Sequence, residues 1–195
     1  ERDITDRGND FLDGGAGSDS VSGGLGDDVL IGAADNDTIE GGDGDDTVIA
    51  TIDDGDDLMT GGAGIDTLDL SQTSAAATVD LAADTSSSAD TGADQLSEIE
   101  NVVGSSGADT ITGDAAANVL TGNGGSDTIE AGDGADTLVA TVGDGDDQMS
   151  GGDGIDTLDL SQTSAPATID LAAGTSSSAD TGFDQISAIE NVMLP

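Results

Sequence analysis

The sequence predicts an all-β solenoid in which short strands stack into two parallel sheets. A nine-residue unit of the form Gly-Gly-x-Gly-x-Asp-x-apolar-x recurs in thirteen phased copies, and copies such as residues 14–22 and 23–31 follow one another without a gap. Glycines fill the first half of the unit, and one apolar residue stands near its end. Such a short unit can bury its apolar residue only by stacking on neighbours, which is typical of a solenoid.

The copies form two blocks, residues 5–69 and 104–159, separated by a stretch that has lost the nine-residue period. Each block contains one break in phase, where two additional residues are inserted: Ala50-Thr51 in the first block and Ala140-Thr141 in the second. Because the residues around both insertions are rich in strand-forming types, we expect the insertions to lengthen a strand.

Each unit predicts one turn followed by one very short strand. Glycines let the backbone take positive φ and turn sharply, so the first six residues form the turn. In the last three residues the apolar side chain points inward between two outward neighbours. Two units make one flat coil of eighteen residues, and equivalent turns stack about 4.8 Å apart. The predicted inward residues are Leu12, Val21, Leu30, Ile39, Val48, Met59, Leu68, Ile111, Leu120, Ile129, Leu138, Met149 and Leu158.

Stacking also brings acidic side chains together. Asp10, Asp28 and Asp46 fall in one column of turns, eighteen residues apart, and Asp19 and Asp37 begin the opposite column. Carboxylates one coil apart repel each other unless a cation lies between them. A hard cation that takes six or more oxygen ligands from carboxylates and carbonyls is most simply calcium. The chain contains no Cys and no His, which excludes the usual zinc and copper ligand sets.

The units resemble the glycine-rich nonapeptide of the RTX, or haemolysin-type, calcium-binding proteins. This resemblance implies a right-handed parallel β-roll, a form of β-solenoid, with one calcium ion between turns that lie one coil apart. It also implies a ligand scheme. The lower turn supplies the carbonyl oxygens of positions two and four and the Asp at position six, and the upper turn supplies the carbonyls of positions one and three and its own Asp.

Along the whole chain, the resemblance implies two kinds of ligand and about eight or nine calcium ions. The implied carboxylate ligands are Asp10, Asp19, Asp28, Asp37, Asp46, Asp57, Asp66, Asp109, Asp127, Asp136, Asp147 and Asp156. The implied backbone carbonyl ligands are Asp6, Gly8, Gly15, Gly17, Gly23, Gly24, Leu25, Gly26, Gly32, Ala33, Ala34, Asp35, Gly41, Gly42, Asp43, Gly44, Ile52, Asp54, Gly61, Ala63, Ser105, Gly107, Gly122, Asn123, Gly124, Gly125, Gly132, Gly134, Val142, Asp144, Gly151 and Asp153.

Two units depart from the family pattern. Residues 32–37 carry Asp35 in place of the fourth-position glycine, so we expect a different backbone turn there, although Asp37 is retained. Residues 113–118 lack both the inner glycine and the Asp, which is replaced by Asn118. We expect this second turn to bind metal poorly or not at all.

A longer period lies over the shorter one. Residues 61–103 match residues 151–193 at an offset of ninety, with 35 of 43 positions identical. Ninety residues equal ten nonapeptides, so the chain is expected to contain two tandem RTX modules and to be part of a longer array. The expected segments are the end of a preceding coil at 1–13, a first module at 14–103 with irregular coils at 70–103, and a second module at 104–195 with irregular coils at 160–195.

The irregular stretch of each module predicts a wider coil with a bulging surface loop. In the first module an alternating strand at residues 78–81 precedes a Ser-rich loop at residues 84–94. An alternative stays open, in which the serines of these loops, at residues 86–88 and 176–178, contact a glycan or a neighbouring molecule.

Composition links folding to cations. The chain has 42 acidic residues, only two basic ones, a formal net charge of −40 and two aromatic residues. So little apolar area and so much self-repulsion predict disorder without counter-ions. We therefore expect calcium binding and folding to be one event. For the acidic residues at position five, such as Asp27 and Asp45, the alternative that they are simply solvated stays open.

The predicted function is a calcium-binding structural region of a secreted or cell-surface bacterial protein that folds after export, with type I secretion implied by the RTX resemblance. The alternatives are a polysaccharide-binding RTX module, or the C-terminal RTX module of a secreted protease or lipase. We expect no enzyme, because without His, Cys, Tyr, Trp and Lys no conventional nucleophile relay can be assembled. So negative a chain is a poor partner for nucleic acid, and no apolar run is long enough for membrane insertion.

Overall fold

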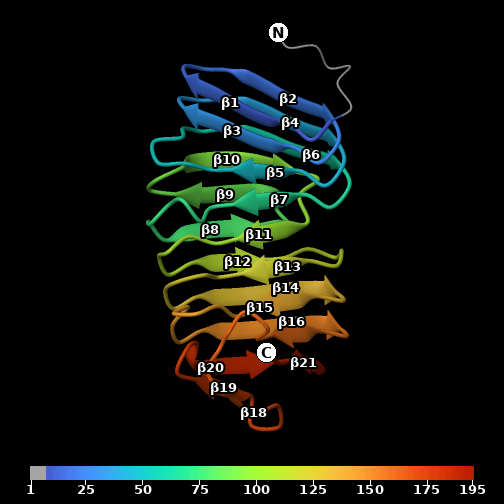
Figure 1. Ribbon diagram of the computed structural model, residues 1–195, viewed down its shortest axis with the longest axis vertical. Coiled ribbons are helices and arrows are strands. Elements are labelled where there is room, and N and C mark those ends of the chain that lie inside the picture. The colour runs from blue at the N-terminus through green and yellow to red at the C-terminus, as the bar shows by residue number, and fades with distance from the viewer. Residues whose placement is uncertain (1–7) are drawn as a thin grey trace.

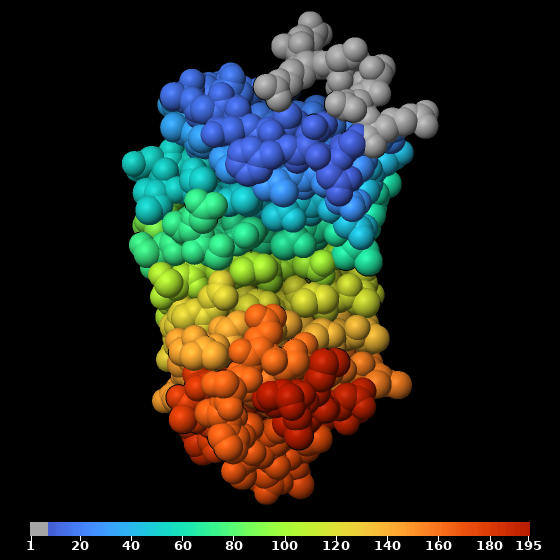
Figure 2. All heavy atoms as spheres, in the orientation of Figure 1, coloured from blue at the N-terminus to red at the C-terminus, as the bar shows by residue number. Residues whose placement is uncertain are grey.

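A computed structural model describes residues 8–195 as a stack of β-coils, and Figure 1 shows the coils following one another along the long axis. In Figure 2 successive parts of the chain form successive bands along this axis. The strands are β1 (Phe11–Ala16), β2 (Ser20–Leu25), β3 (Val29–Ala34), β4 (Thr38–Asp43), β5 (Thr47–Ile49), β6 (Leu58–Ala63), β7 (Thr67–Asp69), β8 (Ala77–Asp80), β9 (Thr85–Ser88), β10 (Gly92–Ser97), β11 (Asn101–Val103), β12 (Thr110–Thr112), β13 (Val119–Thr121), β14 (Thr128–Gly134), β15 (Thr137–Val139), β16 (Gln148–Gly154), β17 (Thr157–Asp159), β18 (Thr168–Asp170), β19 (Thr175–Ser178), β20 (Gly182–Ser187) and β21 (Asn191–Met193).

These strands form two sheets, which confirms the predicted all-β solenoid. One sheet has nine strands, all paired in parallel, in the order β1-β3-β5-β7-β11-β13-β15-β17-β21. The other has twelve strands in the order β18-β19-β20-β16-β14-β12-β8-β9-β10-β6-β4-β2. Outside the segments β8–β10 and β18–β20, which stay in the twelve-stranded sheet, consecutive strands alternate between the two sheets, as a coil of two units requires. Within residues 8–195 there is no helix long and apolar enough to cross a membrane.

Coil length varies more than the nine-residue period predicts. Leu12 pairs with Leu30, eighteen residues on, whereas Val48 pairs with Leu68, twenty residues on. The irregular coil is longer still, because Leu68 pairs next with Val102 across an offset of thirty-four. The ladder nevertheless stays in register, since each inward apolar residue pairs with the next one.

The prediction that the two-residue insertions lengthen a strand is wrong. Strand β5 ends at Ile49, and the Thr51 N–H and hydroxyl then donate to the Asp54 carboxylate at 3.0 and 2.9 Å. In the second block the Thr141 N–H donates to Asp144 at 2.7 Å. These side-chain bonds to the local backbone stabilise a turn in place of a strand. The insertions therefore widen the coil at its corner.

The predicted Ser-rich loop is also wrong. Its serines form β9, which pairs antiparallel with both β8 and β10, and β19 pairs antiparallel with β18 and β20 in the second copy. The Ser86 and Ser176 side chains are buried, and their hydroxyls lie 3.2 Å from Asp94 and 2.7 Å from Asp184. Hydrogen bonds to buried carboxylates let polar serines occupy a sheet interior. These two serines are therefore not available to contact a glycan.

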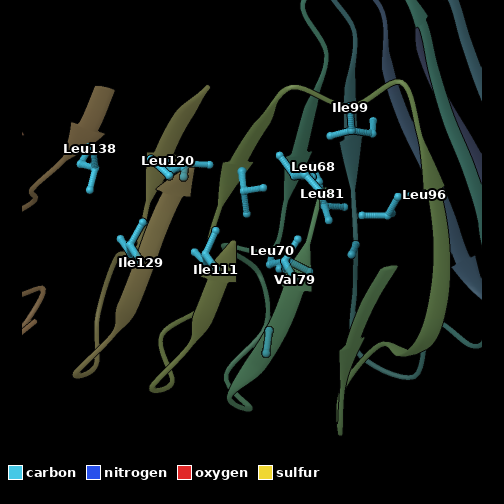
Figure 3. Close-up of a cluster of buried hydrophobic side chains, with 14 of the residues drawn as sticks. Leu68, Leu70, Val79, Leu81, Leu96, Ile99, Ile111, Leu120, Ile129 and Leu138 are labelled. Carbon is cyan, nitrogen blue, oxygen red and sulfur yellow. The ribbon is translucent and has the colours of Figure 1, made fainter. Parts of the chain in front are cut away.

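The core is a column of stacked apolar side chains between the sheets. All predicted inward residues are buried, except that Leu12, in the first described coil, is only partly buried. The irregular coil adds residues that the nonapeptide does not predict, including Val79, Leu81 and Leu96, which Figure 3 shows close to the main ladder. The core therefore runs without interruption through the irregular coil.

Truncating one apolar side chain of this core column is expected to destabilise the calcium-saturated protein. Leu120 has 0% exposure, so Leu120→Ala should leave a cavity and lower the free energy of unfolding by about 2–5 kcal/mol. Val119 is exposed, so Val119→Ala should change stability by less than about 0.5 kcal/mol. Denaturant unfolding of both variants checks this, and equal effects would contradict the described packing.

Candidate metal sites in the turns

Acidic side chains at position six stack in two columns of turns. In the first turn column, the backbone N–H of Asp10, Asp28 and Asp46 donates to Oδ1 of the Asp one coil further along, at 2.7–2.8 Å. In the second turn column, the N–H groups of Asp19 and Asp37 do the same, at 2.7 and 2.8 Å. Each such Asp is therefore held against the turn on either side of it. We call the space between two such turns an interval.

The second oxygen of most of these carboxylates has no hydrogen-bond partner. Among residues 8–195, ten buried carboxylate oxygens face no donor: Oδ2 of Asp19, Asp28, Asp37, Asp46, Asp57, Asp66, Asp127, Asp136 and Asp156, and Oδ1 of Asp144. Buried polar atoms without partners are rare and costly. Nine of the ten belong to position-six aspartates and repeat along the two columns, and they are the strongest indication that a cation belongs in the intervals.

The space around each free oxygen fits an oxygen-liganded cation. A Cβ placed on Gly14, at position one, would lie 2.8 Å from the carbonyl oxygen of Gly32 in the next coil and 3.2 Å from Oδ2 of its own Asp19. At Gly23 it would lie 2.6 Å from the carbonyl oxygen of Gly41 and would overlap Oδ2 of Asp28. Position one is glycine because these two oxygens, one from each turn, converge there.

Carbonyls of positions two and four point along the stack. A Cβ on Gly26 would meet the carbonyl oxygen of Gly8 at 2.6 Å, and one on Gly55 would meet that of Asp35 at 2.7 Å. From the coil above, the carbonyl of Asp43, at position three, points back and accepts the Gly26 N–H at 2.8 Å. Carbonyls that the family's scheme implies as ligands, those of Gly8, Asp35 and Asp43, therefore lie against the neighbouring turn of the stack.

The expectation of a different turn at residues 32–37 is wrong. Ala33 and Asp35 take φ values of 77° and 76°, the left-handed conformation that glycines take at positions two and four of the neighbouring turns. Non-glycine residues adopt this region at some cost. Pairing of the turn with the coils on either side supports it here, and the Asp37 N–H donates to Asp57 at 2.8 Å.

Burial makes the ionised carboxylates unfavourable in the absence of a cation. Burial, with a smaller contribution from neighbouring carboxylates, raises the pKa of Asp57, Asp127 and Asp144 to about 7, despite the opposing backbone hydrogen bonds. The same causes raise the pKa of Asp66 to about 6. A divalent cation in the interval would reverse this preference, because it stabilises the charged form.

Within the part of the chain that the structure describes, no group of three or more His, Cys, Asp and Glu side chains is arranged so that the side chains alone could hold a metal ion. Each interval instead offers two carboxylates from successive turns. A hard cation there must complete its shell with carbonyl oxygens, which the turns supply. This donor set suits calcium and does not suit thiolate- or imidazole-seeking metals.

Four acidic residues of the irregular coils were missed by the sequence prediction. The N–H of Asp66 donates to Glu100 at 2.8 Å, and that of Asp57 to Asp94 at 3.2 Å. Their counterparts Glu190 and Asp184 accept from Asp156 and Asp147 in the second copy, at 2.8 and 3.3 Å. They continue the two turn columns at offsets of thirty-four and thirty-seven. Their repetition ninety residues apart was the one signal that could have found them.

The position-five aspartates have a structural role besides solvation. Oδ1 of Asp27 accepts the Asp45 N–H at 3.1 Å, and Oδ1 of Asp45 accepts the Ile65 N–H at 2.9 Å. Both aspartates are exposed. They therefore form a second, solvent-facing ladder beside the buried one.

The remaining implied ligands are placed as follows. Asp54 and Asp144 bury their carboxylates against Thr51 and Thr141, so their side chains also take part in the corner. Ser105, Gly107 and Asp109 lie in a turn with a different hydrogen-bond pattern. Asp6 lies outside the described residues.

A solenoid whose stacked turns present paired carboxylates and carbonyl oxygens defines a repeat protein built around bound hard cations. The family model of the RTX calcium-binding nonapeptide repeat (4 copies) matches residues 4–30, 22–54, 34–68, 103–138 and 140–159. The chain therefore belongs to the RTX calcium-binding nonapeptide repeat family, and it is a calcium-binding structural β-roll region. No curated protein sequence gives a significant match to the chain.

Proposed function

We propose that this chain is a structural segment of a secreted or cell-surface bacterial protein and that it folds into a stiff rod when calcium binds after export. The ten buried carboxylate oxygens without donors carry this proposal. Without cations they oppose folding, and with calcium they hold each coil to the next. This dependence suits export as an unfolded chain, and the RTX family implies type I secretion as the route.

The site assignment is part of the proposal. Calcium occupies intervals formed by position-six aspartates and by the carbonyls of positions one to four, with about eight or nine ions expected from the family's ligand scheme. The division into modules at residues 14–103 and 104–195 is likewise proposed. It is supported by the repetition of the antiparallel meander β8–β10 as β18–β20.

A structural role fits the side chains better than a catalytic one. The acidic side chains of the turns are used in inter-coil hydrogen bonds, and the sequence offers no His, Cys or Lys that could act as a general base or nucleophile. The rod would space neighbouring parts of the same protein or stabilise it outside the cell.

The calcium concentration that drives folding tests the proposed location. Extracellular calcium modules have dissociation constants of about 10⁻⁴–10⁻³ M. Resistance to a protease, measured across buffered free calcium, should appear in this range and be absent at submicromolar calcium, with magnesium as the control ion. Resistance that is complete at submicromolar calcium would contradict folding after export, while leaving calcium binding itself intact.

A further inference from the structure

Two turns at the start of the second block differ in backbone conformation from the others. In the turns of residues 14–69 and 122–159, positions two and four take positive φ, as at Gly24 (104°) and Gly26 (118°). In the turns at residues 104–109 and 113–118, neither position does so. A change of φ at position two rotates the adjacent peptide groups, so the position-two amide points elsewhere.

In the first of these turns, the backbone amide at position two donates a hydrogen bond to the carboxylate at position six. The Ser105 N–H donates to Oδ2 of Asp109 at 2.7 Å, and the Ser105 hydroxyl lies 2.8 and 3.1 Å from the two carboxylate oxygens. Oδ1 of Asp109 also accepts the Ala77 N–H, at 2.7 Å. Asp109 is 2% exposed, yet it has no oxygen without a donor. Its charge is balanced by donors within the protein.

In the second turn, the position-six side chain is the amide of Asn118, and its polar atoms are also hydrogen-bonded within the protein. Oδ1 of Asn118 accepts the Asp114 N–H at 3.0 Å, which repeats the bond from position two to position six. Nδ2 of Asn118 donates to the carbonyl oxygen of Glu100 at 2.7 Å and to Oδ1 of Asp114 at 3.1 Å. An amide nitrogen donates and cannot ligate a cation. Its hydrogen bonds therefore hold the carbonyl that a cation would otherwise approach.

Both turns lie at the same level of the stack, one in each column. Elsewhere, an Asp such as Asp28 or Asp46 takes part in the interval on either side of it, so successive intervals share a ligand. The N–H groups of Asp109 and Asn118 still donate to Oδ1 of Asp127 and Asp136, at 2.8 and 2.9 Å, but neither side chain has a buried oxygen without a donor that two intervals could share. The next free oxygens are those of Asp127 and Asp136, one coil further on.

We propose that the turns at residues 104–109 and 113–118 bind no calcium and divide each turn column into two separate calcium ladders. This inference rests on the proposed function, because it assumes that the other intervals bind calcium. It removes the site that the family's ligand scheme implies between Asp109 and Asp127. Hydrogen bonds from Ser105 and Asn118 hold the junction coil instead.

A single substitution should restore the missing site. Ser105→Gly converts Gly-Ser-Ser-Gly-Ala-Asp into the regular Gly-Gly-Ser-Gly-Ala-Asp, removes both Ser105 side-chain bonds to Asp109, and lets position two take positive φ. Equilibrium dialysis at saturating calcium should then find one more ion per chain than in the unaltered protein. Ser106→Gly, one residue away in the same turn, is the matched control and should bind the unaltered number.

A second variant keeps the inference testable if Ser105→Gly folds poorly. Asp109→Asn should leave the number of bound calcium ions unchanged, because Asp109 ligates none. Loss of an ion in Asp109→Asn, or an unchanged number in folded Ser105→Gly, overturns the inference. Failure of the unaltered chain to bind calcium at all would overturn the proposed function instead, so the two failures are distinguishable.

Discussion

Asp46→Asn is expected to remove calcium from two neighbouring intervals, whereas Asp45→Asn should leave both filled. Asp46 is 1% exposed, its Oδ1 accepts the Asp28 N–H at 2.8 Å, and its own N–H donates to Asp66 at 2.8 Å. It therefore contributes to the intervals on both sides. Asn118 shows what an amide does at this position: it donates hydrogen bonds where a carboxylate would ligate.

The size of this effect follows from mass action. At free calcium 100-fold above the dissociation constant, each filled site stabilises the fold by about 2.7 kcal/mol, so losing two sites removes about twice that amount. Calorimetric titration should count the lost ions, and denaturant unfolding in calcium should measure the lost stability. Asp45 is exposed and lies beside the ladder, so its variant serves as a charge-matched control. Equal losses in both variants would show that overall charge, and not position six, sets calcium binding.

The second large effect concerns pH: calcium should reverse the direction in which the stability of the fold changes with pH. Burial raises the pKa of Asp57, Asp127 and Asp144 to about 7 in the metal-free folded chain, from an ordinary value of 3.8. Between these values the folded state binds more protons than the unfolded state, so its stability falls as the pH rises. The penalty is absent below pH 3.8 and complete above about pH 7.

Calcium should reverse the sign of this change in stability with pH. Its carboxylate ligands must be ionised, so binding weakens as the pH falls and the calcium-loaded fold is most stable at neutral pH and above. β-Structure measured by circular dichroism in metal-stripped buffer should be greater at pH 5 than at pH 8. In excess calcium it should be at least as great at pH 8 as at pH 5. The same pH dependence with and without calcium would contradict a role for these carboxylates as ligands.

The nine-residue period predicted those features that repeat in phase with it. Val48 and Leu68 were placed in the core correctly although a two-residue insertion separates their units, because strand pairing restores the register. Turns with stacked aspartates were predicted for the same reason. Periodicity fails where a side chain supplies a local hydrogen bond, as Asp54 does for Thr51, because such bonds change the backbone without changing the pattern of apolar residues.

The irregular coils were predicted as wider coils with a strand near residues 78–81, as β8 (Ala77–Asp80) confirms, but their serine strand and acidic residues could not be predicted. Serines have weak strand preferences, and β9 forms because Ser86 meets Asp94, which lies eight residues away along the chain and belongs to another strand. Glu100 and Asp94 continue the turn columns at offsets that no nonapeptide contains. Likewise, the bond from Ser105 to Asp109 depends on a backbone conformation that the residue types alone do not reveal.

Far-UV circular dichroism of the metal-stripped chain during calcium titration tests the central claim most directly, with magnesium as the smaller ion that demands stricter geometry. The account predicts little β-structure at neutral pH without metal and a cooperative gain of β-structure with calcium that magnesium does not produce. Full β-structure in the stripped chain, unchanged by calcium, would show that the apolar ladder alone holds the coils together and would contradict calcium-driven folding.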